Sequence, residues 1–326
     1  MSLTPLVSIC IPAYANQYFL DRLVKSIKGQ TYRPLELVIV DDNSPTPLTA
    51  QNELEETNLQ IRLLRNAESY GPYWNMLHSI SLARGEYIYQ IDHDDYLVDS
   101  NFIENAVGLF ENIPELQLVI ANSELENSER TTLPRTHESG FRYFEGISFL
   151  RNHLFDEIHP ARSGYIMNYK TLVKAKFEDV FFPQHYFDSQ SIYPDESFSL
   201  PVILCSFGDV IVSSEIVSVR GNPPNSFSKT DFWQKNSNVS VLIQHCRLTQ
   251  FLFTNKKYVA GLIMLRACLY GSKHSPKISL RNLSILKNRK IAKSSKLIMV
   301  INFLAHFPGY FLRRVFYSLR FRILGH

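Results

Sequence analysis

Acidic residues are absent from the C-terminal part of this 326-residue chain. Residues 1–231 contain all 31 acidic residues and 17 basic ones, which makes their net charge −14. Residues 232–326 contain the other 17 basic residues and no acidic one, so their net charge is +17. Such a difference predicts two roles: an acidic part that carries a catalytic or binding site, and a basic part that meets an anionic partner.

Cysteine is also scarce. The four cysteines show no CxxC spacing and no accompanying pair of histidines, and they are Cys10, Cys205, Cys246 and Cys268. The sequence therefore predicts neither a zinc site nor a disulfide framework, and it favours a reducing compartment. The first residues lack the basic segment and the cleavage site of a secretory signal peptide, so we expect a cytoplasmic protein.

Long hydrophobic runs are missing as well. Near the C-terminus the longest uncharged run, residues 297–312, includes His306 and the helix-breaking pair Pro308-Gly309. This run falls short of the roughly 20 apolar residues that a membrane-spanning helix needs. Beyond it, apolar and basic residues separate on a helix, and the apolar face consists of Leu312, Val315, Phe316, Leu319 and Ile323.

This C-terminal pattern has two interpretations. A helix with one apolar and one basic face is typical of a segment that lies in a membrane interface. It is also typical of a helix that packs on a protein core and leaves its basic face in water. We expect residues 273–326 to dock on an anionic membrane surface. We expect no nucleic-acid partner, because the length and apolar content of the basic part fit lipid better.

The first 125 residues alternate between strand and helix patterns. Predicted strands cover residues 6–14, 35–40, 61–66, 86–92 and 116–121. Predicted helices lie between them, over residues 19–29, up to about Thr57, over 73–84 and over 102–110. Alternation at this spacing predicts an α/β fold, in which a mostly parallel sheet is flanked by helices.

The remainder of the chain is less regular. The predicted elements are a helix that begins near residue 194, a strand over 209–220, and helices within 236–253 and 257–271. We therefore expect one domain made of two halves, followed by a basic and helical C-terminal extension. The boundaries of these three parts are residues 1–125, 126–231 and 232–326.

Polar clusters directly follow three of the predicted strands: "PAYAN" at residues 12–16, "DDNS" at 41–44 and "DHDD" at 92–95. Ligands of parallel sheets bind at the carboxyl ends of the strands, so we expect these clusters to line one crevice. The glycine-rich phosphate loops GxxxxGK[ST] and GxGxxG are absent. A nucleotide in this crevice would therefore be held by carboxylates and a metal ion.

Three aspartates within four positions, Asp92, Asp94 and Asp95, repel one another unless a cation lies among them. Hard carboxylate oxygens suit Mn²⁺ or Mg²⁺, which complete their coordination with water and substrate phosphates. An EF-hand is excluded, because Leu97 stands where that loop needs glycine. The alternative without metal is that Asp94 or Asp95 caps the next helix or closes a turn.

Asp41 and Asp42 form the second acidic cluster, directly after a hydrophobic strand. Adjacent carboxylates at this place can accept hydrogen bonds from a nucleobase N–H group or from ribose hydroxyls. The alternative is structural, because an aspartate here can also form an Asx turn that leads into Ser44-Pro45. The residues alone leave both interpretations open.

Two longer segments resemble a known family. "PLVSICIPAYANQYFLDRLVKSIKGQTYRPLELVIVDDNS" and "GPYWNMLHSISLARGEYIYQIDHDD" look like the nucleotide-sugar-binding half of family 2 glycosyltransferases, which have the GT-A fold. The likeness is close over about residues 5–125, weak to about residue 220, and absent beyond. It implies a Rossmann-like GT-A domain, in which residues 1–125 bind the nucleotide-sugar and residues 126–231 face the acceptor.

The resemblance also implies roles for single residues. Pro12, Ala13 and Tyr14 would line the base and the ribose. Asp42 would accept a hydrogen bond from the base, with Asp41 in support. These residues match the family at the ends of the first two strands.

Further roles by resemblance concern the diphosphate, the sugar and the metal. Gly71 and Asn75 match the family's glycine and asparagine ahead of the metal-binding strand, where they face the diphosphate or the sugar. Asp92 would contact the ribose or donor sugar and contribute to the metal site. Asp94 would hold Mn²⁺ or Mg²⁺, and His93 between the two aspartates would be a spacer.

The segment "YPDESF" at residues 193–198 resembles the family's acidic pair at the start of an acceptor-side helix. We assign Asp195 as the general base, with Glu196 as the second choice. Pro194 stands where the family has its first acid. A carboxylate in the first turn is also favoured at any helix N-terminus, so a purely structural role is the alternative.

The resemblance implies that a sugar is transferred, with inversion, from a nucleoside-diphosphate sugar to a hydroxyl of a glycan or lipid-linked acceptor. We expect the donor to be a UDP-sugar and the enzyme to need Mn²⁺ or Mg²⁺. Its setting would be cell-surface polysaccharide synthesis, in the cytoplasm or on the inner face of the cell membrane. The alternatives are a nucleotidyltransferase or nucleotide-sugar hydrolase on the same scaffold, and a degenerate protein that binds a nucleotide-sugar or glycan without turnover.

Overall fold

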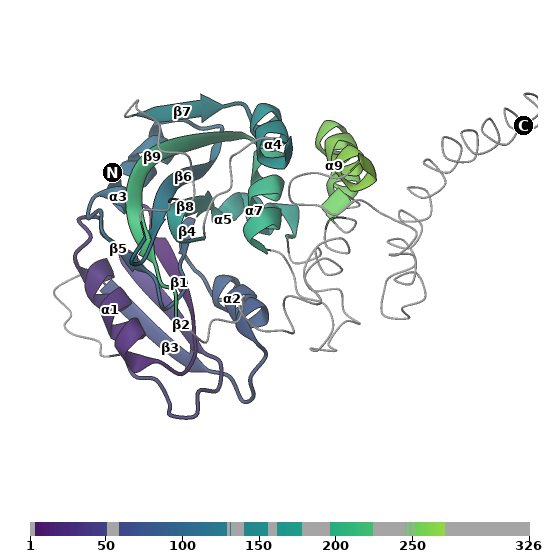
Figure 1. Cartoon of the computed structure of the whole chain (residues 1–326). Helices are drawn as coiled ribbons and strands as arrows, with labels where there is room; N and C mark the ends of the chain where they lie inside the picture. Colours follow the sequence, from purple (N-terminus) through teal and green to yellow (C-terminus); the bar gives the residue numbers. More distant parts are fainter. Residues whose placement is uncertain are drawn as a thin grey trace, which may run out of the picture.

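One mixed sheet organises the part of the chain that the structure describes (Figure 1). Its strands are β1 (Val7–Ala13), β2 (Leu35–Asp41), β3 (Leu59–Arg65), β4 (Tyr87–Gln90), β5 (Tyr96–Leu97), β6 (Leu116–Leu125), β7 (Phe141–Phe144), β8 (Tyr165–Asn168) and β9 (Asp209–Arg220). The computed structural model describes residues 4–50, 59–128, 131, 140–155, 162–177, 196–223, 245, 248–249 and 251–270.

The strands follow the order β3-β2-β1-β4-β8-β6-β9-β5, and β7 pairs with β9 outside this path. β1 pairs in parallel with β2 and β4, and β2 with β3. Every residue of β1 and β2 is buried, which is typical of parallel strands covered on both faces. The predicted α/β fold with a mostly parallel sheet is confirmed, although β5, β7 and β8 pair antiparallel with their neighbours.

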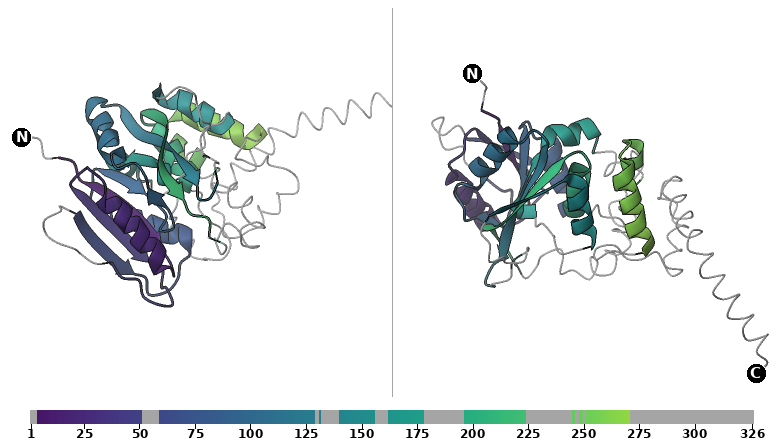
Figure 2. Two further views of the ribbon diagram at one scale, coloured as in Figure 1. Left: turned by 60° about the vertical axis from the view of Figure 1, so that its left-hand side comes forward. Right: turned by 90° about the horizontal axis from the view of Figure 1, so that it is seen from above.

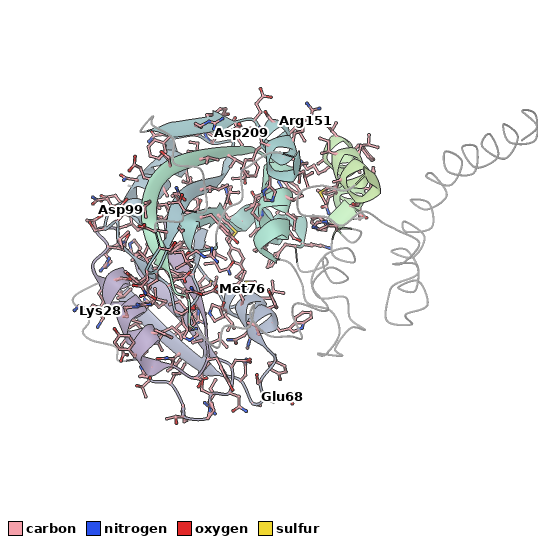
Figure 3. The ribbon with its side chains drawn as sticks, in the orientation of Figure 1. Lys28, Glu68, Met76, Asp99, Arg151 and Asp209 are labelled. Carbon is pink, nitrogen blue, oxygen red and sulfur yellow. The ribbon has the colours of Figure 1, made fainter. Side chains whose placement is uncertain are left out.

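Helices cover both faces of the sheet (Figures 1 and 2). One face carries α1 (Gln17–Lys28) and α3 (Phe102–Asn112). The other carries α2 (Pro72–Ser81), α4 (Gly146–Phe155), α5 (Tyr169–Ala175) and α7 (Glu196–Cys205). The alternation of side chains along β1 separates the two cores, because Ile9 packs with the first set of helices and Cys10 with the second. Met76 projects from α2 into the second core (Figure 3).

Helix α1 illustrates why these segments fold as they do. Its buried residues recur at helical spacing, and the Asn16 side chain caps the first turn by accepting from the amide of Phe19 at 3.3 Å. The chain leaves the helix at Gly29. Local signals of this kind explain why the predicted helix over residues 19–29 is confirmed.

Several boundaries differ from the prediction. β4 ends at Gln90, so the acidic cluster lies in a turn rather than in the strand predicted to residue 92. α2 ends at Ser81 instead of residue 84. Residues 45–50 contain no helix, and the rest of the helix predicted up to Thr57 lies outside the described residues.

Between residues 126 and 231 the predicted helix and strand are confirmed as α7 and β9. The sequence did not predict α4, α5 or β8, which are short and are stabilised by packing against the rest of the domain. β8 and β9 complete the same sheet as β1 and β4. The two halves therefore share one sheet.

The basic extension is described only in part. Helix α9 (Tyr258–Tyr270) matches the helix predicted over 257–271 and packs beside α4 (Figure 2). Residues 271–326 lie outside the described residues, so the docking segment remains a prediction. Among the helices that the structure describes, none combines the length and apolar content needed to cross a bilayer.

Candidate functional site

The carboxyl ends of β1, β2 and β4 lie side by side at one edge of the sheet. Ala13 is opposite Asp41 in the β1–β2 register, and the amide of Asp42 donates to the carbonyl of Ala13 at 2.9 Å. The amide of Ile91 donates to the carbonyl of Cys10 at 3.2 Å, which extends the β1–β4 pairing toward the acidic turn. The three polar clusters therefore lie at the ends of neighbouring strands, as expected for the carboxyl ends of parallel strands.

The first cluster turns the chain from β1 into α1. Pro12 and Ala13 are buried, whereas the side chain of Tyr14 is 48% exposed. Ala15 has a φ of 65°, and its amide donates to the hydroxyl of Ser44 at 2.8 Å, which ties this turn to the second cluster. Of the three residues expected to line a base and ribose, Tyr14 alone offers an exposed side chain.

Asp41 closes a turn at the end of β2. One carboxylate oxygen accepts from the amide and hydroxyl of Ser44, and the other accepts from the Leu48 amide at 3.3 Å and from Arg65 Nη1 at 2.6 Å. Burial opposes ionisation, but the hydrogen bonds from Ser44, Leu48 and Arg65 outweigh it and hold the pKa of Asp41 below its ordinary value. Asp41 therefore has the structural role that the sequence left open: it closes the turn after β2 and supports the loop that carries Asp42.

Replacing Asp41 by asparagine is expected to lower the free energy of unfolding by about 1–3 kcal/mol at neutral pH, because an amide donor would replace an acceptor among these donors. Folding lowers the pKa of Asp41. The wild-type advantage is therefore present above the unfolded pKa of about 4 and is lost as the pH falls through the folded pKa. Urea unfolding from about pH 7 to about pH 3 measures this, and a pH-independent difference would contradict it.

Asp42 holds the loop between β3 and α2. Its side chain is 3% exposed and accepts four hydrogen bonds. One oxygen accepts from Asn66 Nδ2 and the Tyr70 amide, both at 2.9 Å, and the other from the Ser69 hydroxyl and the Gly71 amide, both at 2.8 Å. A carboxylate has about four lone-pair sites, so these donors saturate it. Asp42 can accept from a nucleobase only when one of them moves away.

Gly71 and Asn75 place α2 against the strand ends. Gly71 has a φ of 84°, which favours glycine, and Pro72 begins the helix. Asn75 is 2% exposed, donates to the Val40 carbonyl at 2.8 Å and accepts from Asn66 at 3.0 Å. α2 packs directly on β1 and β2 and buries the amide of Asn75 between them, and the expectation that Asn75 faces a diphosphate stays a prediction.

The carboxylates of the acidic turn differ in their exposure to solvent. Asp92 and Asp94 are partly exposed, whereas Asp95 is buried and accepts from the Gly221 amide at 2.9 Å. Burial, and then the charges of Asp92 and Asp94, raise the pKa of Asp95 well above its ordinary value. Asp95 therefore has a structural role, but it bonds the end of β9 rather than capping the next helix or closing a turn, which was the alternative for this cluster. The partly exposed carboxylates of Asp92 and Asp94 are the groups of this turn that would stabilise a divalent cation.

The donor set of this turn fits such a cation in part. The carboxylates of Asp92 and Asp94 offer hard oxygen ligands at a strand end. Within the described ranges, no group of three or more His, Cys, Asp and Glu side chains could hold a metal ion. Mn²⁺ or Mg²⁺ at this turn would therefore complete its coordination with water and a substrate diphosphate, which is usual for these ions.

His93 has more contacts than a spacer would need. Its ring meets that of Phe19 edge-on at a centroid distance of 6.3 Å. Burial lowers the pKa of His93 below its ordinary value. The flanking aspartates and hydrogen bonds to the backbone of Tyr14 and Pro12 favour the charged ring and oppose this shift. The ring thus connects the acidic turn to the turn after β1.

The predicted general base cannot be placed relative to this edge. Asp195 lies outside the described residues, and Glu196 is the first residue of α7. α7 packs on the same face of the sheet as α2 and contacts α4. The roles of Asp195 and Glu196 therefore stay predictions.

Two residues that contact the acidic turn were not predicted from the sequence. Arg22 on α1 donates to the carbonyl of Asp94 at 2.6 Å, across a separation of 72 residues. Gly221, directly after β9, reaches Asp95 across 126 residues. Neither contact leaves a local pattern in the sequence, although a glycine at the end of a strand can indicate close approach of two backbones.

Comparison with known proteins extends this description. Residues 8–171, just over half of the chain, match the family described as "Glycosyl transferase family 2". The chain belongs to this family. The membership confirms the resemblance carried by the strand-end motifs, and the fold described above agrees with it.

Curated relatives within family 2 are similar over part of their length. Abequosyltransferase RfbV of Salmonella typhimurium is 25% identical over 182 residues, which are 53% of each chain. A Campylobacter jejuni GalNAc(5)-diNAcBac-PP-undecaprenol beta-1,3-glucosyltransferase is 32% identical over 97 residues, 29% of this chain and 31% of that protein. The chain therefore spans about half or less of these curated relatives.

Solved structures show the same fold. TarS of S. aureus matches with a TM-score of 0.58 and 13% identity, over 90% of this chain and 82% of the other. The complex of TarS with UDP-GlcNAc matches with a TM-score of 0.52 and 16% identity, over 90% of each chain. Identities this low show the fold alone, which is that of a family 2 GT-A domain.

Proposed function

We propose that this family 2 protein is a metal-dependent, inverting glycosyltransferase. It would move a sugar from a UDP-sugar to a hydroxyl of a glycan or lipid-linked acceptor in cell-surface polysaccharide synthesis. The observation that carries the proposal is the negative turn after β4, which lies beside the ends of β1 and β2. Relatives support the substrate classes, because one carries undecaprenol in its name and TarS has been solved with UDP-GlcNAc.

The donor would lie along the strand ends. Tyr14 offers its exposed ring to the base, and Asp42 accepts the base N–H after releasing one donor of the loop that it holds. Asp92 and Asp94 would bind the cation that accompanies the diphosphate. When bound, Mn²⁺ or Mg²⁺ neutralises the negative charge that grows on the departing diphosphate.

The proposed chemical step is a single displacement. Asp195 takes the proton of the acceptor hydroxyl while the hydroxyl oxygen forms its bond to the anomeric carbon. The bond between that carbon and the diphosphate oxygen breaks on the opposite side, and its electron pair leaves with the diphosphate. Attack opposite the leaving group inverts the anomeric configuration.

A panel of nucleotide sugars tests the function. We expect one UDP-sugar to raise the melting temperature of the protein in the presence of Mn²⁺, and to be consumed slowly by hydrolysis or rapidly when an acceptor is added. NMR of the product should show the anomeric configuration opposite to that of the donor. Binding without consumption would instead support the degenerate binding protein, and the absence of both responses for every donor would refute the transferase.

Residues 273–326, within the basic extension, are proposed to dock on an anionic membrane surface. Residues 232–326 carry no acidic residue, and α9 within them exposes Tyr258, Val259 and Leu262. Each basic residue near such a surface contributes about 1 kcal/mol, which salt screens. We expect the full chain to float with liposomes that contain phosphatidylglycerol and to be released by high salt. Equal flotation with neutral phosphatidylcholine would contradict the electrostatic part.

A further inference from the structure

The backbone of the acidic turn is held from one side by Arg22. Its Nη2 donates to the carbonyl oxygen of Asp94 at 2.6 Å, and its Nη1 donates to Oε1 of Glu126 at 2.5 Å. The guanidinium lies 4.4 Å from the ring centroid of Tyr96 and 5.3 Å from that of Phe19. Two aromatic rings and two hydrogen bonds fix the plane of the guanidinium, so its bond to Asp94 has a defined direction.

This arrangement differs from an ordinary surface ion pair. The side chain of Arg22 is 20% exposed, and its Nε is buried without a hydrogen-bond partner, which is unfavourable. Glu126 is itself held in place, because its amide donates to the carbonyl of Arg220 at 2.8 Å. The carbonyl of Asp94 and the rings of Tyr96 and Phe19 contact the guanidinium in addition to Glu126, so Arg22 does more than form an ion pair.

Gly221 holds the same turn from the other side. Its amide donates to the carboxylate of Asp95 at 2.9 Å. A Cβ atom at this position would lie 2.5 Å from the carbonyl oxygen of Asp94 and 3.0 Å from its Cβ. Only glycine therefore lets the end of β9 approach the backbone of Asp94 this closely.

Arg22 and Gly221, together called the clamp, contact the backbone of Asp94 from two sides. Asp92 and Asp94 carry like charges two positions apart and repel one another. Repulsion alone would spread their backbone, whereas the clamp fixes it between α1 and the end of β9. The side chain of Asp94 stays partly exposed at the sheet edge.

We propose that Arg22 and Gly221 are positioning residues for Asp94, which keep its carboxylate oriented toward the divalent cation of the donor complex. Neither residue touches donor or cation in this scheme, and the inference rests on the cation-binding role proposed for Asp94. The clamp predicts that substitutions on α1 and after β9, far apart in the sequence, weaken the same property, which is the Mn²⁺-dependent binding of the donor diphosphate.

The test compares Arg22→Lys and Gly221→Ala with the wild type. Lysine keeps the charge of Arg22 but not its paired donors, and alanine adds the Cβ that meets Asp94. Calorimetry measures the affinity for UDP, GDP, CDP and dTDP with MnCl₂ and with EDTA. The Mn²⁺-dependent gain is the affinity with MnCl₂ divided by the affinity with EDTA. For the diphosphate that binds the wild type best, we expect this gain to be about tenfold smaller in each variant, while the affinity with EDTA stays unchanged.

Matched controls separate positioning from folding. Arg142→Lys changes an arginine that lies over Phe144 on β7, and Gly108→Ala adds a Cβ in open space on α3, so both should keep the full gain. An equal loss of affinity with and without Mn²⁺, together with a lower melting temperature, would show a merely structural role and overturn the proposal. If Gly221→Ala reduces the folded fraction, Arg22→Lys decides alone.

The design also separates this inference from the proposed function. Asp94→Asn should abolish the Mn²⁺-dependent gain that the wild type shows. If Asp94→Asn abolishes it while Arg22→Lys and Gly221→Ala keep it, the clamp is refuted and the function stands. If the wild type shows no such gain with any of the four diphosphates, the cation role of Asp94 and the clamp are overturned together.

Discussion

Replacing Asp94 by asparagine is expected to lower kcat/KM for sugar transfer by about 10³-fold and to weaken donor binding in the presence of Mn²⁺. The amide oxygen is a weaker ligand, and the substitution removes one negative charge from the turn. Stabilisation of the leaving diphosphate by a bound cation is worth several kcal/mol, and about 4 kcal/mol corresponds to this factor. Steady-state kinetics over a range of Mn²⁺ concentrations measures the effect.

Two controls define this result. EDTA should reduce the wild type to about the rate of the Asp94 variant and leave the variant itself unchanged. Asp99→Asn is the matched substitution, because Asp99 lies five residues further on, outside the acidic turn, and accepts from the Asn101 amide at 2.8 Å through an oxygen that asparagine keeps (Figure 3). We expect it to retain activity. Full Mn²⁺-dependent turnover by Asp94→Asn would remove the metal site from the proposal.

Replacing Asp195 by asparagine is expected to lower kcat by on the order of 10²–10⁴ while the affinity for the donor stays unchanged. A positioned general base contributes about this factor, and it acts on the acceptor hydroxyl rather than on the nucleotide. Asp195 precedes α7, which the structure describes from Glu196 onward. Single-turnover rates and calorimetric donor affinities separate the two quantities.

The same measurements decide between the two acids that the sequence offers. If Glu196→Gln causes the large loss and Asp195→Asn does not, the second choice is the base. A matched control is Asp21→Asn on the exposed side of α1, where the carboxylate accepts from Gln17 at 2.7 Å. Wild-type turnover in both Asp195→Asn and Glu196→Gln would refute the general base in this segment.

The first half of the domain could be predicted because its signals are local. β1 and β2 are mostly apolar and fully buried, and α1 repeats its buried positions at helical spacing. The short elements of the second half, α4, α5 and β8, offered no such pattern. β8 contributes four residues to the sheet and is defined by pairing with β4 and β6, which a local pattern cannot show.

For the candidate site residues, the sequence could not show which side chains are buried and bonded within the chain. Asp41 and Asp42 stand at the end of β2 and Asn75 on α2, but the motif that resembles the family could not show that hydrogen bonds within the chain already occupy all three. The reason is geometric, because the partners lie up to 62 residues away and come together through the packing of α2 and β3 against β1 and β2. Tyr14, in the turn between β1 and α1, is exposed.

By itself, the sequence determined membership of family 2, the alternation of strands and helices, and the position of three polar clusters at the ends of parallel strands. These follow from periodicity and chain order, which are local properties. Only the tertiary structure decided which carboxylates are structural and which are available to a ligand. Asp41, Asp42 and Asp95 accept hydrogen bonds from the chain itself. Asp92 and Asp94 stay partly exposed. That division depends on donors from distant segments, because a buried carboxylate is stable only where folding brings partners to it.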